Sequence, residues 1–206
     1  IKYVSNSLLA TMISFSNEIG NMCSAVPGVD ARLVWKGVHL DRRLTPINGQ
    51  VGGAAGVTEY LWHGLGFGGS CFPKDVAALR SFGRTVGEQT RMLDAVLDIN
   101  TDQPLRMVAL LEKELSLAGK TVAVLGLACK PGTDDLRESP ALPLVAELRK
   151  KGAKVLVHDP IAMPHAKKRP EFRDVVFAED WAEALRKSDA CCLVTAWPEY
   201  RSIQPT

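Results

Sequence analysis

The chain has 206 residues, of which 46% are hydrophobic and 23% are charged, and its formal net charge is +2. These values are typical of a globular protein with a buried core, and they exclude the strongly basic surface of most proteins that bind nucleic acid or anionic membranes. The apolar runs are also far shorter than the roughly 20 residues that a membrane-spanning helix needs. We therefore expect neither a nucleic acid nor a membrane as a partner.

Residues 1–117 are predicted to form an all-helical domain. From Tyr3 onward, apolar residues recur at steps of three and four, which indicates an amphipathic helix that ends before Pro27. The chain begins at Ile1 in the middle of this pattern, so we expect an upstream part of the protein to precede it. After a second, short helix, the glycine-rich residues 44–59 predict a flexible surface loop.

Two further helices are expected in this domain. Pro73 is suited to the first turn of a helix, and the residues that follow it have helical periodicity. The next apolar pattern predicts a long helix that is interrupted or bent near Pro104.

Residues 118–206 show a different pattern, in which apolar strands alternate with helices. The run KTVAVLGL is typical of a parallel strand that is buried on both faces, and further strands are predicted at KVLVHDP, DVVF and DACCLVTAW. This alternation calls for right-handed βαβ units. The predicted fold class is therefore α/β, with an all-helical domain followed by a doubly wound, Rossmann-like parallel sheet of three or four strands.

Ligands of such sheets bind outside the carboxyl ends of the strands. The segment GLACKPGTDDLRES follows the first predicted strand and contains Lys130 and Arg137, which are candidates to hold a phosphate. Its glycines, Gly126 and Gly132, do not form a G-x-G-x-x-G fingerprint. We therefore do not expect a dinucleotide to bind this half in the usual way.

The cysteines form an odd set of five, with no C-x-x-C pair and no histidine at metal-ligand spacing. This usage predicts free thiols in a reducing, cytoplasmic compartment and no bound metal.

Cys71 differs from the other cysteines in its surroundings, the stretch GFGGSCFPKD at residues 66–75. Most free cysteines are small packing residues. Here the glycines allow the backbone to approach a ligand and to turn N–H groups toward an oxyanion. The predicted helix start and Lys74 favour the thiolate over the thiol. We therefore predict that Cys71 is a nucleophile.

Asp75 lies four residues after this cysteine, and Lys2 and Asn6 have the spacing of one helix face. A carboxylate in a first helical turn stabilises the helix by roughly 0.3 to 1 kcal/mol, which is the structural interpretation of Asp75. Beside a nucleophile it can instead orient or deprotonate the water that cleaves a covalent intermediate. For Lys2 and Asn6 alone, a solvated surface patch is the simpler interpretation.

Three stretches in fixed order, KYVSN, GFGGSCFPKD and VLGLACKPGTDDLRESPA, resemble the UDP-glucose/GDP-mannose dehydrogenase family of nucleotide-sugar 6-dehydrogenases. In that family an NAD-binding domain comes first, then a helical domain that pairs two subunits, and then a sheet domain that binds the nucleotide of the substrate. The resemblance implies that this chain holds the last two domains, without the NAD-binding domain and with an incomplete C-terminus. It also implies NAD as cofactor, a nucleotide sugar as substrate and a homodimer through the helical domain.

The resemblance also implies roles for individual residues. Cys71 would attack the C6 aldehyde, while Lys2 and Asn6 would stabilise the oxyanion and hold a water that Asp75 helps to activate. The implied substrate contacts are Tyr60, Phe67, Gly68, Lys130 and, for the substrate of a neighbouring subunit, Arg43. The implied cofactor contacts are Lys74 and Arg137. Between Arg43 and Tyr60 the chain is longer than is usual in the family.

The activity implied is that of a UDP-glucose 6-dehydrogenase, which oxidises the C6 alcohol to a carboxylate in two hydride transfers through a cysteine thiohemiacetal and thioester. A UDP-N-acetylhexosamine or GDP-mannose 6-dehydrogenase is an alternative, because pocket shape decides specificity and no single motif encodes it. An alternative of another class is a non-catalytic module that binds a nucleotide sugar and dimerises. The isolated chain is expected to be inactive, because it lacks the domain that holds the hydride acceptor.

Overall fold

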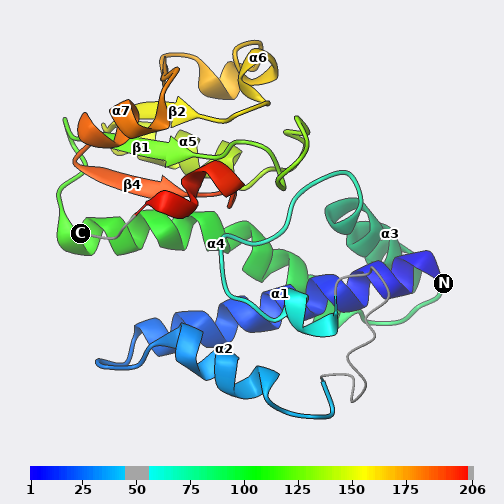
Figure 1. Cartoon of the computed structure of the whole chain (residues 1–206). Coiled ribbons are helices and arrows are strands. Elements are labelled where there is room, and N and C mark those ends of the chain that lie inside the picture. The colour runs from blue at the N-terminus through cyan, green and yellow to red at the C-terminus, as the bar shows by residue number, and fades with distance from the viewer. Residues whose placement is uncertain (45–55, 204–206) are drawn as a thin grey trace. The chain divides into compact units, whose positions relative to one another are not determined.

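Figure 1 shows the computed structural model of the chain, which describes residues 1–44 and 56–203. Within the described residues the chain divides into two compact units. The helical unit comprises Ile1–Gly66 and Cys71–Gln103, and the sheet unit comprises Phe67–Ser70 and Pro104–Thr206. Most of the predicted loop at residues 44–59 lies outside the described residues. The predicted domain boundary at residue 117 stays a prediction.

The helical unit confirms the predicted order of helices. Its elements are α1 (Lys2–Ser24), α2 (Ala31–His39), the 3₁₀ helix η1 (Val57–Tyr60), α3 (Phe72–Thr85) and the first part of α4 (Arg91–Glu114). The Asp30 carboxylate caps α2 by accepting from the N–H of Arg32 at 2.8 Å. Pro73 lies in the first turn of α3, where a missing N–H costs no intrahelical hydrogen bond.

The long helix α4 continues through Pro104 instead of being interrupted there. A proline in a helix interior removes one hydrogen bond, so the flanking turns have to be held by packing. Val96 is buried in the helical unit and Val108 is buried in the core of the sheet unit. Both halves of α4 are therefore fixed by apolar burial on either side of the proline.

The sheet unit is built on four parallel strands in the order β3-β2-β1-β4. The strands are β1 (Thr121–Leu125), β2 (Lys154–His158), β3 (Val176–Phe177) and β4 (Ala190–Leu193). The helical elements between and after them are α5 (Ala141–Lys150), α6 (Met163–Ala166), η2 (Pro170–Phe172), α7 (Trp181–Arg186) and η3 (Pro198–Ser202). The α/β fold class is confirmed, and α6 is an element that the sequence pattern did not predict.

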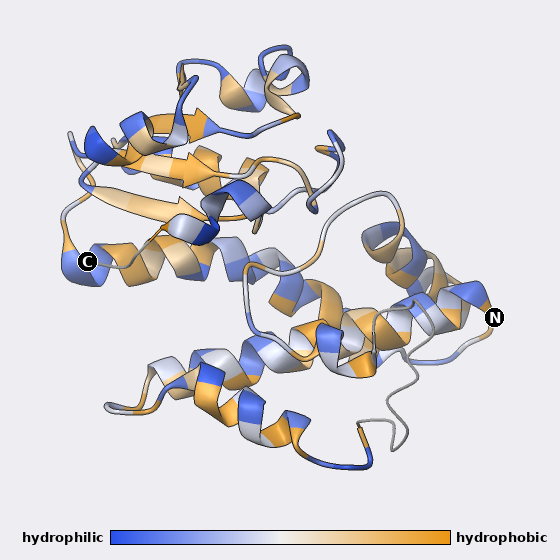
Figure 2. Ribbon diagram, in the orientation of Figure 1, coloured by the Kyte–Doolittle hydropathy of each residue, from blue (hydrophilic) through white to orange (hydrophobic). Residues whose placement is uncertain are grey.

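Helices cover both faces of the sheet because alternate strand residues point to opposite faces. Val124 of β1 belongs to one buried cluster with Leu144 of α5, whereas Ala123 belongs to another with Ala184 of α7. Figure 2 shows β1, β2 and β4 in the colours of hydrophobic residues. The strands β1 and β2 are buried on both faces along almost their whole length, whereas β4 is partly exposed. No helix among the described residues is long and apolar enough to span a membrane.

The core of the sheet unit predicts a large cost for truncating a buried leucine. Leu144 is fully buried, so Leu144→Ala removes apolar contacts and leaves a cavity, and we expect the free energy of unfolding to fall by about 2 to 5 kcal/mol. Urea denaturation measures this as a lower midpoint at an unchanged slope. The control is Leu110→Ala, because Leu110 is exposed on α4 and its truncation is expected to cost less than about 1 kcal/mol. Equal losses in the two variants would contradict this view of the core.

Candidate active site

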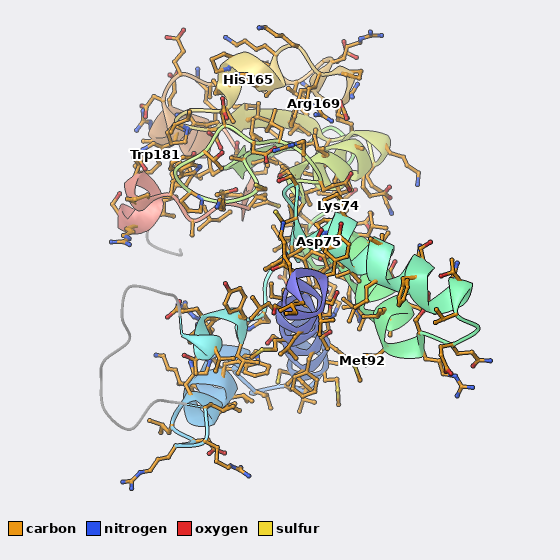
Figure 3. All side chains as sticks on the ribbon, turned by 90° about the vertical axis from the view of Figure 1, so that its right-hand side faces the viewer. Lys74, Asp75, Met92, His165, Arg169 and Trp181 are labelled. Carbon is orange, nitrogen blue, oxygen red and sulfur yellow. The ribbon has the colours of Figure 1, made fainter. Side chains whose placement is uncertain are left out.

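The carboxylate of Asp75 is the centre of a polar cluster in the helical unit. It lies in the first turn of α3 with 0% of the residue exposed, and it accepts a hydrogen bond from Asn6 Nδ2 at 2.7 Å. Lys74 Nζ forms a close ion pair with its Oδ1, and Lys2 Nζ lies 4.0 Å from its Oδ2. Figure 3 shows Lys74 and Asp75 next to each other on α3, close to the N-terminal end of α1. The structure thus brings together all four of these predicted residues.

Electrostatics within this cluster keep the Asp75 carboxylate ionised. The hydrogen bond from Lys74 lowers the pKa of Asp75 most, and the Asn6 hydrogen bond and the charges of both lysines add to the lowering, although burial opposes it. The same hydrogen bond raises the pKa of Lys74, and the charges of Asp75, Tyr3 and Cys71 raise it further. The Lys74 ammonium also lies 5.1 Å from the centre of the Tyr3 ring.

Cys71 is the N-cap residue of α3, and it is exposed. Its carbonyl oxygen accepts a hydrogen bond from the backbone N–H of Asp75 at 2.8 Å. Cys71 therefore lies at the beginning of the helical turn that carries Asp75, and its side chain is not buried in an apolar core.

The glycine-rich segment just before Cys71 belongs to the sheet unit. The N–H of Gly69 donates to the carbonyl oxygen of Arg137 at 2.8 Å, and a Cβ on Gly68 would lie 2.2 Å from the carbonyl oxygen of Glu138. No side chain fits at position 68 without moving the backbone of Glu138. Gly68 therefore has a packing reason in addition to the ligand contact that the sequence suggested.

Lys130 and Arg137 lie on the connection between β1 and α5, at the carboxyl edge of the sheet. In the sheet, β2 lies on one side of β1 and β4 lies on the other, so the order of the strands reverses at β1. Ligands of open α/β sheets bind at such a switch point, outside the carboxyl ends of the strands. Lys130 is exposed, and the guanidinium of Arg137 donates two hydrogen bonds to Asp135, at 2.9 and 2.8 Å. Asp135 therefore holds Arg137 in one orientation.

Arg137 also lines an open polar pocket of about 480 Å³ between its connection and the region of α6. The far wall contributes three basic residues that sequence reasoning missed, His165, Lys168 and Arg169. The basic run KKR at residues 167–169 was the signal for Lys168 and Arg169, and His165 lies two residues before it. It was missed because the four-residue helix α6 has no periodicity that reveals it.

His158 and Asp159, at the end of β2, have a structural role. The buried Asp159 carboxylate accepts five hydrogen bonds, from the backbone N–H groups of Leu127, Ala128, Ile161 and Ala162 and from the indole of Trp197. It thereby fixes the turns that follow β1 and β2. The ring of His158 bonds to the hydroxyl of Tyr200 at 2.7 Å.

The remaining predicted binding residues are distributed over both units. In the helical unit, Tyr60 ends η1 with its ring 6.3 Å from that of Phe72, and Arg43 is exposed and paired with Asp41. This pairing lowers the pKa of Asp41 to about 2. In the sheet unit, Phe67 is buried. Among the described residues there is no group of three or more metal-ligating side chains that could hold a metal ion.

Comparisons with known proteins match almost the whole chain to one family. Residues 1–102 match the central domain of the UDP-glucose/GDP-mannose dehydrogenase family, and residues 123–206 match its UDP binding domain. UDP-glucose 6-dehydrogenase AglM of Haloferax volcanii is 43% identical over 98% of this chain and 44% of the relative, and TuaD of Bacillus subtilis is 39% identical over 99% and 41%. The solved structure of a UDP-glucose dehydrogenase from Pyrobaculum islandicum has a TM-score of 0.86 and 41% identity, and the match covers 98% of this chain and 44% of that one. The chain thus spans less than half the length of these relatives.

The buried Asp75 carboxylate predicts a pH-dependent contribution to stability. Its pKa in the folded chain lies below the ordinary value of 3.8, so the ionised form stabilises the fold above that value, and the stabilisation is lost as the pH falls through the folded pKa. We expect Asp75→Asn to lower the melting temperature at pH 7 and to match the unmodified chain more closely as the pH is lowered below 4. Thermal melts across this range measure the difference, with Asp134→Asn at an exposed carboxylate as control. A difference that does not depend on pH would contradict the electrostatic origin.

Proposed function

Because the chain belongs to the UDP-glucose/GDP-mannose dehydrogenase family, we propose that it supplies the nucleophile and the nucleotide-sugar site of a UDP-glucose 6-dehydrogenase. The observation that carries the proposal is the buried Asp75 carboxylate, which gathers Lys2, Asn6 and Lys74 at the first turn of the helix that Cys71 caps. A thiol, an amide and two ammonium groups at one helix end suit the chemistry of an acyl intermediate.

In the proposed reaction the C6 alcohol of the sugar becomes a carboxylate in two oxidations. Loss of a hydride and a proton gives an aldehyde, to whose carbon the Cys71 thiolate adds to form a thiohemiacetal. Loss of a second hydride and proton gives a thioester. Water then adds to the thioester carbon and releases two protons to the solvent as the C–S bond breaks, so that a carboxylate leaves and Cys71 regains its thiolate.

The polar cluster around Asp75 supports separate tasks for its members. Lys2 and Lys74 have side chains that are 67% and 59% exposed, so their ammonium groups can donate to ligand oxygens while they remain close to the carboxylate. Asn6 is held by Asp75 and can position a water or an oxyanion. The lowered pKa of Asp75 makes it a weak base, which favours orienting the hydrolytic water over deprotonating it.

The cofactor proposed for this reaction is NAD, and two residues of this chain are proposed to contact it. NAD, when bound, accepts one hydride in each oxidation. Lys74 and Arg137 fit a dinucleotide phosphate, because each is cationic with more than half of its side chain exposed. Each is also held by an aspartate, which restricts its orientation.

Five residues of this chain are proposed to contact a nucleotide sugar. Lys130 is an exposed cation at the switch point of the sheet and suits a diphosphate, and Phe67 and Gly68 come from the glycine-rich segment. Tyr60 offers an aromatic ring, and Arg43 is proposed to reach the substrate of a second subunit. UDP-glucose is favoured as the substrate because relatives at about 40% identity carry that activity in their names.

The covalent role of Cys71 is tested by replacing its sulfur in the complete protein. We expect Cys71→Ser to lower the rate of uronic acid formation from UDP-glucose by at least about 1,000-fold, because serine lacks a comparable nucleophile. The control is Cys191→Ser, because Cys191 is also an exposed cysteine, but partial desolvation on β4 raises its pKa to about 11, so it stays a thiol at neutral pH. Iodoacetamide at neutral pH should accordingly label Cys71 before Cys191. Acid formation at the original rate in Cys71→Ser would refute the proposal.

The proposed assembly is a homodimer through the helical unit. Three large apolar residues of α1, Leu8, Phe15 and Met22, are exposed and spaced by seven residues, so they lie along one side of the helix. Such a line of exposed apolar side chains is typical of an interface between helices. We propose that the same line of a second copy packs on it, because a two-fold contact uses one surface twice.

A charge in this line should prevent dimerisation. Met22→Glu would bury an unpaired carboxylate in the proposed interface. We therefore expect the dissociation constant of the dimer, measured by sedimentation equilibrium, to rise at least tenfold. The matched control is Met92→Glu, because Met92 is an equally exposed methionine of α4, labelled in Figure 3. Dimers of undiminished affinity in Met22→Glu would overturn this interface.

A further inference from the structure

The irregular segment at residues 61–66 is held in the helical unit by amide side chains. At its centre, the N–H of Gly64 donates to Asn17 Oδ1 at 2.7 Å, and the carbonyl oxygen of Gly64 accepts from Gln103 Nε2 at 2.8 Å. Asn17 is fully buried and Gln103 is 7% exposed. Gly64 itself is exposed, but both of its bonds go to buried side chains, and two helices, α1 and α4, each supply one. We call Asn17 and Gln103 the amide clamp.

A further residue of α1 supports the clamp. Asn21 Nδ2 donates to Gln103 Oε1 at 2.9 Å, and Gln103 Nε2 donates to Asn21 Oδ1 at 3.3 Å. Because the carbonyl oxygen of Gly64 can only accept, it fixes the orientation of the Gln103 amide, with the nitrogen toward Gly64. The clamp is therefore set before any ligand binds.

The segment also lies directly against α1. A Cβ on Gly20 would lie 2.5 Å from Cβ of His63, so only glycine allows this approach. At the start of the segment, the carbonyl oxygen of Leu61 bonds to His39 Nε2 at 3.0 Å. The segment is thus hydrogen-bonded to the helices at Leu61 and Gly64, and it packs against α1 at His63.

We propose that Asn17 and Gln103 are positioning residues, which hold residues 61–66 so that Tyr60, which directly precedes this segment in the helical unit, is preset for the nucleotide sugar. This inference rests on the proposed function, in which Tyr60 contacts the substrate. A loop that is ordered in advance loses less conformational entropy when a ligand binds. Without the clamp, that entropy is lost on binding and affinity falls, while the reacting groups around Asp75 keep their contacts.

The test uses Gln103→Met in the complete protein, because methionine keeps the size of the side chain and removes the donor to Gly64. We expect hydrogen exchange of residues 61–66 to accelerate at least tenfold. The KM for UDP-glucose should rise about tenfold, and kcat should change less than threefold. Gln103→Glu is the second variant, in case methionine disturbs folding, since it keeps the acceptor for Asn21.

The matched control is Ser14→Ala. Ser14 is also buried on α1 and donates to a backbone oxygen of α4, that of Val96 at 3.0 Å, but it does not contact residues 61–66 through this bond. This control should lower the melting temperature without changing KM.

Three results would overturn the inference. These are unchanged exchange in both Gln103 variants, faster exchange with an unchanged KM, and an equal rise of KM in Ser14→Ala. A complete protein that does not oxidise nucleotide sugars would refute the proposed function and the positioning role together. The exchange measurement would then still show whether the clamp holds the segment.

Discussion

A carboxylate without solvent contact needs donors, and at Asp75 this requirement joins the first turn of α3 to the first two turns of α1. The donors are the amide of Asn6 and the ammonium of Lys74, with that of Lys2 nearby, so burial of one anion gathers the polar groups of the candidate site. The same residue donates its backbone N–H to Cys71. One buried charge therefore links the first turn of α3 to the amide and the cations that surround it, and Cys71 begins that same turn.

The sheet unit solves a similar problem with Asp159. Its carboxylate accepts hydrogen bonds from two turns and an indole, and this ties the connection that follows β1 to the one that follows β2. Lys130 lies on the first of these connections, two residues after Ala128. In each unit a buried aspartate thus joins separate segments: Asp75 joins side chains of α1 and α3, and Asp159 joins the turns that follow β1 and β2. The lysines proposed to meet ligands, Lys2, Lys74 and Lys130, are exposed.

The sequence predicts those features that depend on neighbours along the chain. The periodicity of α1, the proline at the start of α3 and the apolar run of β1 are local signals, and the structure confirms them. The role of Gln103 and Asn17 was not predicted, because a polar residue in a helix usually faces solvent. Their shared partner Gly64 also lies far away in the sequence, 39 residues from Gln103 and 47 from Asn17. An aspartate at position 75 is expected both for stabilising the start of a helix and for a site near Cys71. The hydrogen bond with Asn6 of α1 is what favours the second role, because it is not needed for the first. The glycine at position 68 suggested a ligand, although the backbone of Glu138 is a sufficient reason for it.

The assignment of Phe67–Ser70 to the sheet unit has a consequence for how this protein can be divided. These four residues lie far upstream of the strands in the sequence, and the chain returns to the helical unit directly after them. A fragment of the sheet unit that begins after Cys71 would therefore lack these four residues, which belong to the same compact unit. Recombination between relatives that exchanges the sheet as one block would combine a glycine-rich segment from one parent with the 137–139 backbone of another. Exchange of this kind is restricted to pairs of parents in which those two surfaces still match.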